Sequence, residues 1–249
     1  MNDQMQAPLS PEPSGKTGIS EWFSTWMTAV TKPGEQTYAA MAEHPDAATT
    51  SRAFTWVFLV GTISAIVNGV LMSVLELAGF ASQTPGLADL FGSAERGIAF
   101  SLGVSLCLSP VAGAVAVLFF AIAVGLVQWV AGMFGGTGNF SKLAYTMAAI
   151  SVPFTLVSSL LTPFSSIPYL GICIGLVSLL LSIYVVVMEI MAVKGVNRFS
   201  WGKAIGSFFL PTLTVLCICV ALPIGVIAAM RLLGPQVGDT FSVINSSLP

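Results

Sequence analysis

Long stretches of this chain carry no charged residue, and they are long enough to cross a lipid bilayer. The uncharged runs cover residues 53–75, 97–141, 143–188 and 204–230 of the 249-residue sequence. A helix rises about 1.5 Å per residue and the hydrocarbon core is about 30 Å thick, so one span needs about 20 residues. The first and last runs each hold one helix. A helix over residues 143–193 would be about 75 Å long, so this segment is expected to fold back as a hairpin.

The composition excludes an ordinary soluble domain. Hydrophobic residues make up 55% of the chain, charged residues only 8%, and the mean hydropathy is +0.89. Soluble domains typically contain about 25% charged residues, because their surfaces face water. The sequence contains no basic patch of the kind that binds nucleic acids. The expected partner of most of the surface is therefore the lipid bilayer.

These patterns predict an all-α integral membrane protein, a bundle of five transmembrane helices with an amphipathic N-terminal helix. The five spans are expected within a membrane domain over residues 53–233, at about 54–80, 107–133, 143–161, 169–193 and 204–233. Pro110 is expected to break the second uncharged run and to leave residues 98–106 outside the span. Residues 162–168 are expected to form the hairpin turn, residues 194–203 a loop, and residues 234–249 a short extracytoplasmic tail.

The N-terminal region is predicted to lie outside the membrane. Residues 1–18 are rich in Pro, Ser, Gln and Gly and are expected to form a disordered tail. Residues 19–52 are predicted to be a cytoplasmic amphipathic helical segment, with a second short helix at about 35–43. One helical stripe in this segment contains Ile19, Trp22, Phe23, Trp26, Met27 and Val30. The stripe indicates either a helix in the membrane interface or one that packs on the bundle.

The orientation follows from the distribution of Lys and Arg. With five spans, one side of the membrane holds Lys16, Lys32, Arg52, Lys142, Lys194, Arg198 and Lys203, and the other holds Arg96 and Arg231. Short cytoplasmic segments carry an excess of Lys and Arg. The count of seven to two predicts a cytoplasmic N-terminus and an extracytoplasmic C-terminus in a multi-pass membrane protein.

One charged residue inside a predicted span stands out. Glu189 lies five residues before Lys194 in the fourth predicted span, close to its cytoplasmic end. An ionisable group inside a bilayer is costly and is usually either paired or functional. Because cations lie close by, the preferred interpretation is a structural intramembrane ion pair between Glu189 and Lys194. An ion or proton site at Glu189 is the alternative.

The sequence offers no set of residues for catalysis, for a metal ion or for a cofactor. Its four cysteines, Cys107, Cys173, Cys217 and Cys219, lie in apolar runs and are expected to be buried, and His44 is the only histidine. No nucleophile, base and orienting group can be assembled, so the protein is predicted not to be an enzyme. Gly171 and Gly175 have the spacing that lets two helices approach closely.

Several short motifs in the second half of the chain resemble the Yip-domain family. They are the turn from Gly135 to Phe140, the pair Ala144 and Tyr145 followed by Pro153, the segment from Ala192 to Val196, and the segment from Phe199 to Ala204. The resemblance covers residues 22–233 and is greatest to prokaryotic members, which implies a location in a prokaryotic cell membrane. It implies five helices, a cytosolic tail and a non-enzymatic role. Eukaryotic members interact with Rab-type GTPases, but their Asp-Leu-Tyr-Gly-Pro motif is absent between Met1 and Ser51.

The resemblance and the lack of catalytic residues predict a membrane scaffold or adaptor for protein partners. The expected partner is a membrane or cytoplasmic protein of unknown identity, and a homo-oligomer is left open. The candidate contacts are Trp22, Trp26, Lys194, Arg198 and Lys203. The alternative function is a small transporter or an accessory subunit of a transport complex. In that case Pro110, Pro153, Pro211 and Pro223 would mark broken helices around a central site.

Overall fold

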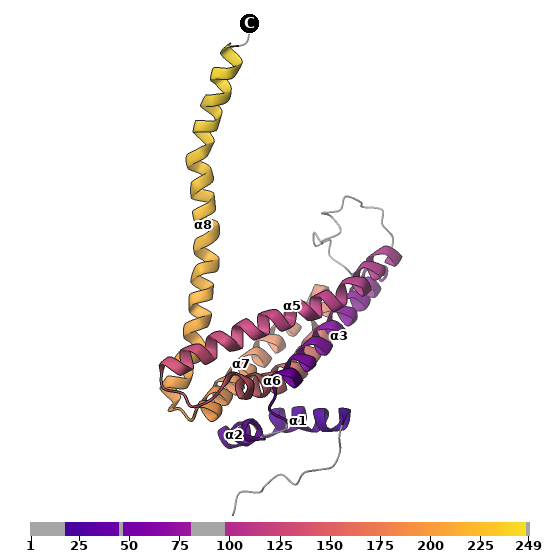
Figure 1. Ribbon diagram of the computed structural model, residues 1–249. Helices are drawn as coiled ribbons and strands as arrows, with labels where there is room; N and C mark the ends of the chain where they lie inside the picture. Colours follow the sequence, from indigo (N-terminus) through magenta and orange to yellow (C-terminus); the bar gives the residue numbers. More distant parts are fainter. Residues whose placement is uncertain (1–17, 45–46, 81–97, 248–249) are drawn as a thin grey trace, which may run out of the picture.

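The computed structural model describes residues 18–44, 47–80 and 98–247, and every regular element in these ranges is helical. The elements are α1 (Ile19–Thr31), α2 (Glu35–Glu43), α3 (Thr50–Leu77), α5 (Ile98–Met133), α6 (Phe140–Leu161), the 3₁₀ helix η1 (Thr162–Ser166), α7 (Leu170–Asn197) and α8 (Trp201–Ser247). Figure 1 shows α3, α5, α6 and α7 as a bundle with α1 and α2 beneath it. The tail predicted for residues 1–18 lies almost wholly outside the described residues.

Four helical segments of the described chain are long and apolar enough to cross a membrane: Thr50–Leu75, Leu102–Met133, Phe140–Ser166 and Leu170–Asn197. Their outer surfaces carry large apolar side chains, and Leu118, Phe119, Ile172 and Leu180 are each more than half exposed. Such a continuous apolar surface suits hydrocarbon and not water. The chain is therefore a multi-pass membrane protein, and the predicted all-α membrane fold is confirmed.

Helix α6 is the centre of the bundle. All residues from Leu143 to Ile150 are buried, and α6 contacts α1, α2, α3, α5 and α7. Asn139 starts the helix, because its side chain accepts a hydrogen bond of 2.9 Å from the Lys142 backbone N–H. The capped start of α6 therefore leads directly into the buried stretch of the helix.

The predicted break at Pro110 is wrong. Helix α5 runs without interruption from Ile98 to Met133 and contains Pro110, so residues 98–106 belong to the same helix as the span. Proline has no N–H to donate to the carbonyl four residues earlier, which here is Leu106. The Ser109 hydroxyl donates to that Leu106 carbonyl instead, at 2.8 Å. This local replacement lets the helix continue within the membrane.

Glycines bring α3 and α5 close together. A Cβ atom added to Gly113 would lie 2.8 Å from the Phe58 carbonyl oxygen, and one added to Gly69 would lie 2.8 Å from the Ser105 Cβ. A Cβ atom added to Gly61 on α3 would lie 3.3 Å from the Gly113 Cα. Side chains at these positions would push the two helices apart. By contrast, a Cβ atom added to Gly175 meets nothing within 4 Å, whereas one added to Gly171 would meet the backbone of Ser165 in the preceding η1.

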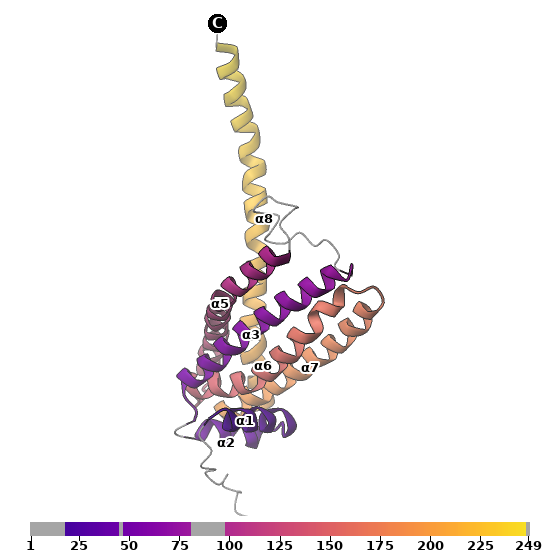
Figure 2. The same cartoon turned by 90° about the vertical axis from the view of Figure 1, so that its right-hand side faces the viewer.

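Helices α1 and α2 lie across one end of the bundle, which we call the base (Figures 1 and 2). The base also contains the starts of α3, α6 and α8 and the ends of α5 and α7. Helix α2 has the predicted bounds, because Gly34 precedes it in an extended conformation and Pro45 follows shortly after it. The charged side chains discussed below gather at the base.

The chain after α7 differs from the prediction. Residues 194–203 are not a loop: α7 continues to Asn197, and α8 begins at Trp201. Helix α8 has 47 residues, which corresponds to about 70 Å, and it leaves the base beside α5 and α7 before rising away from the bundle (Figure 1). Its first part, Trp201–Cys217, is a shorter apolar helix at the site of the predicted fifth span. Residues 234–247, predicted as a tail, continue this helix.

The described cysteines are also not where they were expected. Cys107, Cys173 and Cys217 are exposed on the protein surface, and they form no disulfide. In an apolar span, a small side chain can face lipid without the cost that it would have in water, so burial inside the protein is not required. The side chain of Cys219 lies outside the described part of the structure.

Candidate functional site

An aromatic cluster holds α1 against the bundle. Trp56 on α3 is 1% exposed, and its ring centroid lies 5.1 Å from that of Tyr145 on α6. From α1, Trp22 and Trp26 approach Trp56 edge-on, with centroid distances of 6.1 and 5.7 Å. Edge-to-face aromatic pairs add about 0.5–1.5 kcal/mol each to the burial of their area. An ion pair of 2.8 Å between Arg52 and Glu21 adds a polar contact between the same two helices, α3 and α1.

Two tyrosines complete the hydrogen bonding at the end of α1. The Ala29 carbonyl has no N–H partner four residues on, because that residue is Pro33. The Tyr38 hydroxyl donates to it at 3.0 Å, and the Tyr184 hydroxyl on α7 donates to the Val30 carbonyl at 3.2 Å. Burial raises the pKa of the Tyr38 phenol, and the neighbouring Tyr184 adds to this effect. The phenol therefore stays protonated and able to donate.

Helix α2 is clamped to the end of α7 by two ion pairs. Lys194 binds Glu35, and Arg198 binds Glu43 at 2.5 Å. Between them, Gly195 allows close contact, because a Cβ atom there would lie 2.6 Å from the Glu35 carbonyl oxygen. The Lys194 side chain is 13% exposed, whereas that of Arg198 is 72% exposed. The inner pair therefore contributes more to docking, and the outer pair remains open to solvent.

The glycine-rich turn between α5 and α6 packs against the end of α7. Gln128 donates through Nε2 to the Gly138 carbonyl at 2.9 Å and to Asn197 Oδ1 at 3.2 Å. An added Cβ on Gly136 or Gly138 would lie 2.5 or 2.8 Å from Asn197 Oδ1. Asn197 is 1% exposed, so its amide is a buried polar centre whose partners are all provided. Only glycine fits at these two positions of the turn.

A short turn joins α7 to α8. Arg198 has a left-handed backbone conformation with φ of 55°, and the next residue, Phe199, donates its N–H to the Lys194 carbonyl at 3.1 Å. Lys203 in the first turn of α8 donates to the Phe134 carbonyl at 3.0 Å, which ties α8 to the end of α5. The Lys194 ammonium also lies 4.6 Å from the centroid of the Trp201 ring.

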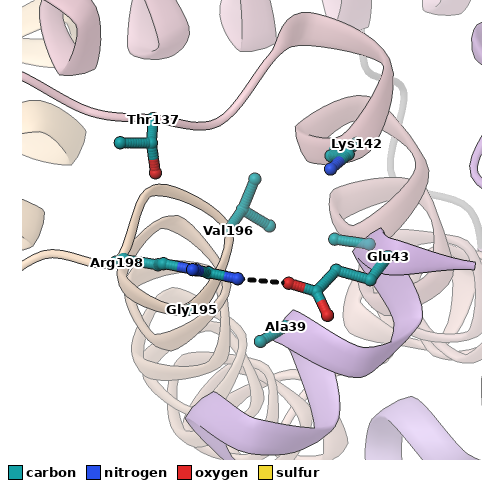
Figure 3. A pocket seen from close by; sticks show the side chains of 8 residues that line it. Ala39, Glu43, Thr137, Lys142, Gly195, Val196 and Arg198 are labelled. Atoms are coloured by element: carbon teal, nitrogen blue, oxygen red, sulfur yellow. Dashed lines mark hydrogen bonds and ion pairs between the residues drawn. The ribbon is translucent and has the colours of Figure 1, made fainter.

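These contacts enclose a polar pocket of about 220 Å³ at the base. Figure 3 shows Arg198 bound to Glu43 within it, and Lys142 from the start of α6 points into the same space. Thr137 contributes a hydroxyl to the lining. Ala39 on α2 and Gly195 on α7 also line the pocket, and their small size leaves space between these two helices. Among the described residues, Lys142 forms no ion pair within 4.0 Å. With two cations and one carboxylate, the pocket can bind an acidic group.

The structure separates the residues singled out in the sequence. Trp22 and Trp26 are half-buried and face the bundle, where they anchor α1. Arg198 and Lys203 lie at the α7–α8 turn with exposed side chains. The predicted pair of Glu189 and Lys194 is not formed, because Lys194 binds Glu35, and no ion pair of the described residues includes Glu189. The partner Glu35 is 159 residues away in sequence, so local spacing could not indicate it.

A family model of the Yip1 domain matches residues 27–222, which is most of the 249-residue chain. The chain belongs to the Yip1 domain family. The resemblance that rests on the turn at Gly135 and on the segments around Val193 and Trp201 is therefore confirmed. A comparison with curated proteins finds no match, and neither does a comparison with solved structures.

The Yip1 domain match contains the pocket but not the whole aromatic cluster. It begins directly after Trp26 and ends inside α8. All residues that line the pocket lie inside it, whereas Trp22 and Trp26 lie outside. Glu35, Glu43, Thr137 and Lys142 were not identified from the sequence as site residues. The described residues contain no group of three His, Cys, Asp or Glu that could hold a metal ion.

Proposed function

We propose that this Yip1-domain protein is a non-enzymatic membrane scaffold or adaptor that holds a protein partner at the base. The gathering of charged side chains at the base carries this proposal. The three ion pairs of the described residues all join α1 or α2 to the base ends of α3 or α7. Residues 53–75, 97–141 and 143–188 contain no charged residue at all. Within the described residues, the ion pairs therefore gather at the base.

We further propose that the base faces the cytoplasm of a prokaryotic cell. Six of the seven cations assigned to the cytoplasmic side lie in or next to base elements: Lys32, Arg52, Lys142, Lys194, Arg198 and Lys203. Lys16, the seventh, lies outside the described residues. Cytoplasmic segments of membrane proteins carry such an excess of cations.

Reporter fusions test this orientation. A reporter inserted before Ile19 is expected to behave as cytoplasmic. With the apolar start of α8 as the fifth span, a reporter fused after Pro249 is expected to behave as extracytoplasmic. A cytoplasmic signal from the C-terminal fusion would show that the start of α8 does not cross the membrane as a fifth span.

The partner is proposed to place an acidic side chain in the pocket. Lys142 lines it without an ion pair among the described residues, and Arg198 is largely exposed despite its bond to Glu43. An entering carboxylate would meet both cations, and charge-assisted hydrogen bonds of this kind are shorter and stronger than neutral ones. Lys194 is proposed to act structurally, since it already holds Glu35.

Cross-linking from the pocket tests the scaffold function. A photo-reactive amino acid in place of Thr137, which is exposed and lines the pocket, is expected to capture a discrete partner in cells. Lys142→Glu is expected to abolish that adduct by charge repulsion. The matched control Lys32→Glu, at an exposed cation outside the pocket, should leave the adduct unchanged. Equal loss in both variants, or no adduct at all, would contradict the proposal.

Solute transport is the competing function. Transporters of this size often use helices broken near the membrane centre, with backbone groups directed at the solute. Pro110 and Pro153 instead lie inside continuous helices, and this supports the scaffold. Purified protein reconstituted alone in liposomes decides between the two functions. A saturable flux of any solute would replace the scaffold with a transporter.

A further inference from the structure

An apolar cleft of about 540 Å³ lies between the end of α5 and the first third of α8. It is distinct from the polar pocket and shares none of its lining residues. The α5 wall is formed by Leu126, Trp129, Val130, Met133 and Phe134. The α8 wall is formed by Leu210, Pro211, Thr214 and Val215.

The cleft exists because the two helices meet at one end and then separate. At the base, Lys203 binds the Phe134 carbonyl, and a Cβ atom on Gly206 would lie 3.6 Å from the Phe134 ring. Beyond this contact, α8 rises away from α5, as Figure 1 shows. Leu210 is the first lining residue of α8 after the contact, and Val215 is the last. The opening between the helices therefore lies within the apolar part of both.

The walls present almost no polar atoms to an occupant. The one hydroxyl in the lining, that of Thr214, donates to the Leu210 carbonyl at 2.9 Å and is satisfied within α8. Trp129 and Met133 are 66% and 72% exposed, so the α5 wall is open to the surroundings of the bundle. In a membrane-spanning helix those surroundings are hydrocarbon.

The size of the cleft favours a flexible chain over another helix. A helix is about 10 Å wide, so two turns of it occupy roughly 850 Å³. The cleft holds about 540 Å³, and its wall on α8 runs over six residues, from Leu210 to Val215, which is about 1.7 turns. Its volume falls in the range of about 300–1,000 Å³ typical of small-molecule sites. A single acyl chain satisfies both limits.

A cation marks the base end of the cleft. Lys203 lies two helical turns before Leu210, has an exposed side chain, and uses one N–H for the Phe134 carbonyl. An ammonium group has three N–H donors, so two remain for a further acceptor. An anionic phosphate at the membrane surface would lie next to this group while its chain entered the apolar part.

We propose that the cleft between α5 and α8 binds one acyl chain of an anionic phospholipid, with Lys203 contacting the phosphate. This site goes beyond the scaffold function and does not depend on it. The lipid would fill the space where α8 separates from the bundle, and it would thereby support the position of α8. The ligand class follows from an apolar cleft that opens to hydrocarbon and ends at a cation.

Native mass spectrometry of the purified full-length protein tests the site. The probes are a phosphatidylglycerol and a phosphatidylcholine with the same palmitoyl and oleoyl chains. The unmodified protein is expected to retain one phosphatidylglycerol after transfer to mild detergent. Val215→Trp, which fills the cleft, should reduce the fraction of protein that retains phosphatidylglycerol about tenfold, because the methylenes of the acyl chain lose their contacts with the cleft. The matched control Leu213→Trp, at an exposed residue that does not line the cleft, should retain the lipid.

Lys203→Gln tests the contact with the lipid headgroup separately from the contact with the acyl chain. This variant is expected to lose the preference for phosphatidylglycerol and to retain both lipids equally and weakly. Equal retention by Val215→Trp and the unmodified protein would overturn the proposal. So would retention of free oleate as strongly as the phospholipid, or a bound species with the mass of a polypeptide. The polypeptide result would make the cleft an interface with another helix.

Discussion

The Tyr38 hydroxyl donates to the Ala29 carbonyl over 3.0 Å, and both residues are completely buried. This bond replaces the N–H that Pro33 lacks. Tyr38→Phe should therefore lower the stability of the protein by about 1 kcal/mol, because a buried carbonyl loses its donor. Thermal unfolding in detergent measures the loss. Tyr169→Phe, at a residue that is 88% exposed, is the control and should have no effect.

The same bond predicts a dependence on alkaline pH. Burial raises the pKa of Tyr38 above its ordinary value of 10.0, so the folded protein favours the protonated phenol. Its contribution to stability is complete below the unfolded pKa of about 10 and declines as the pH rises above it. The unmodified protein should lose stability faster above pH 10 than Tyr38→Phe does. Parallel decline of the two proteins would contradict this assignment.

The buried and the exposed residues of the apolar stripe of α1 should have different functions. Trp26 packs on Trp56, so Trp26→Ser should destabilise the protein by about 2 kcal/mol or more. Phe23, one turn earlier on the exposed row with Ile19 and Met27, is 60% exposed. Phe23→Ser should leave the stability in detergent unchanged but reduce quenching of the remaining tryptophans by lipids brominated near the headgroup. Equal destabilisation by both changes would show that the whole stripe packs on the bundle.

The two ion pairs of α2 should differ in strength. Glu35→Gln leaves the Lys194 cation, which is 13% exposed, without its partner, whereas Glu43→Gln affects a pair exposed by more than half on each side. Glu35→Gln should therefore increase amide hydrogen exchange in α2 by about fivefold or more, and Glu43→Gln by less than twofold. The charge-swapped double variant, Glu35→Lys with Lys194→Glu, should partly restore the protection of α2 against hydrogen exchange. Identical protection in the two single variants would exclude this ranking.

The contact of α3 with α5 should depend on Gly113. Gly113→Leu would place atoms against the Phe58 carbonyl and should destabilise the protein by about 1–3 kcal/mol. Gly103, on the same helix, has nothing within 4 Å of an added Cβ, so Gly103→Leu is the matched control. Size-exclusion chromatography after heating compares the folded fractions. A larger loss from Gly103→Leu would refute the proposed contact.

The elements that the sequence predicted best are those bounded by local signals. The bounds of α2 follow from Gly34 and Pro45, and the first four spans follow from stretches without charge. The prediction at Pro110 was wrong because the Ser109 hydroxyl donates to the Leu106 carbonyl, which the proline leaves without its usual N–H donor. The sequence does not show this orientation of the Ser109 side chain. The spacing of Gly171 and Gly175 is visible in sequence, yet the close helix contact uses Gly61, Gly69 and Gly113, which only the packing of α3 on α5 identifies.

The candidate site was harder to predict, because its residues come from distant parts of the chain. Arg198 and Lys194 were recognised as cations near a membrane boundary, but their partners Glu43 and Glu35 lie 155 and 159 residues away. Trp22 and Trp26 were recognised as an amphipathic stripe, and the stripe alone could not distinguish lipid from Trp56 as the surface they meet. Periodicity gives the face of a helix but not what covers it.

The left-handed conformation of Arg198 links backbone strain to the position of its charge. A residue with a Cβ atom costs about 1–2 kcal/mol in this conformation, whereas glycine adopts it freely. The turn therefore holds a strained residue whose guanidinium binds Glu43 and lines the pocket. Glycine at this position would relieve the backbone strain, but it would also remove the ion pair with Glu43 and one of the two cations at the pocket. The strain of the backbone and the position of this cation are therefore linked in the α7–α8 turn.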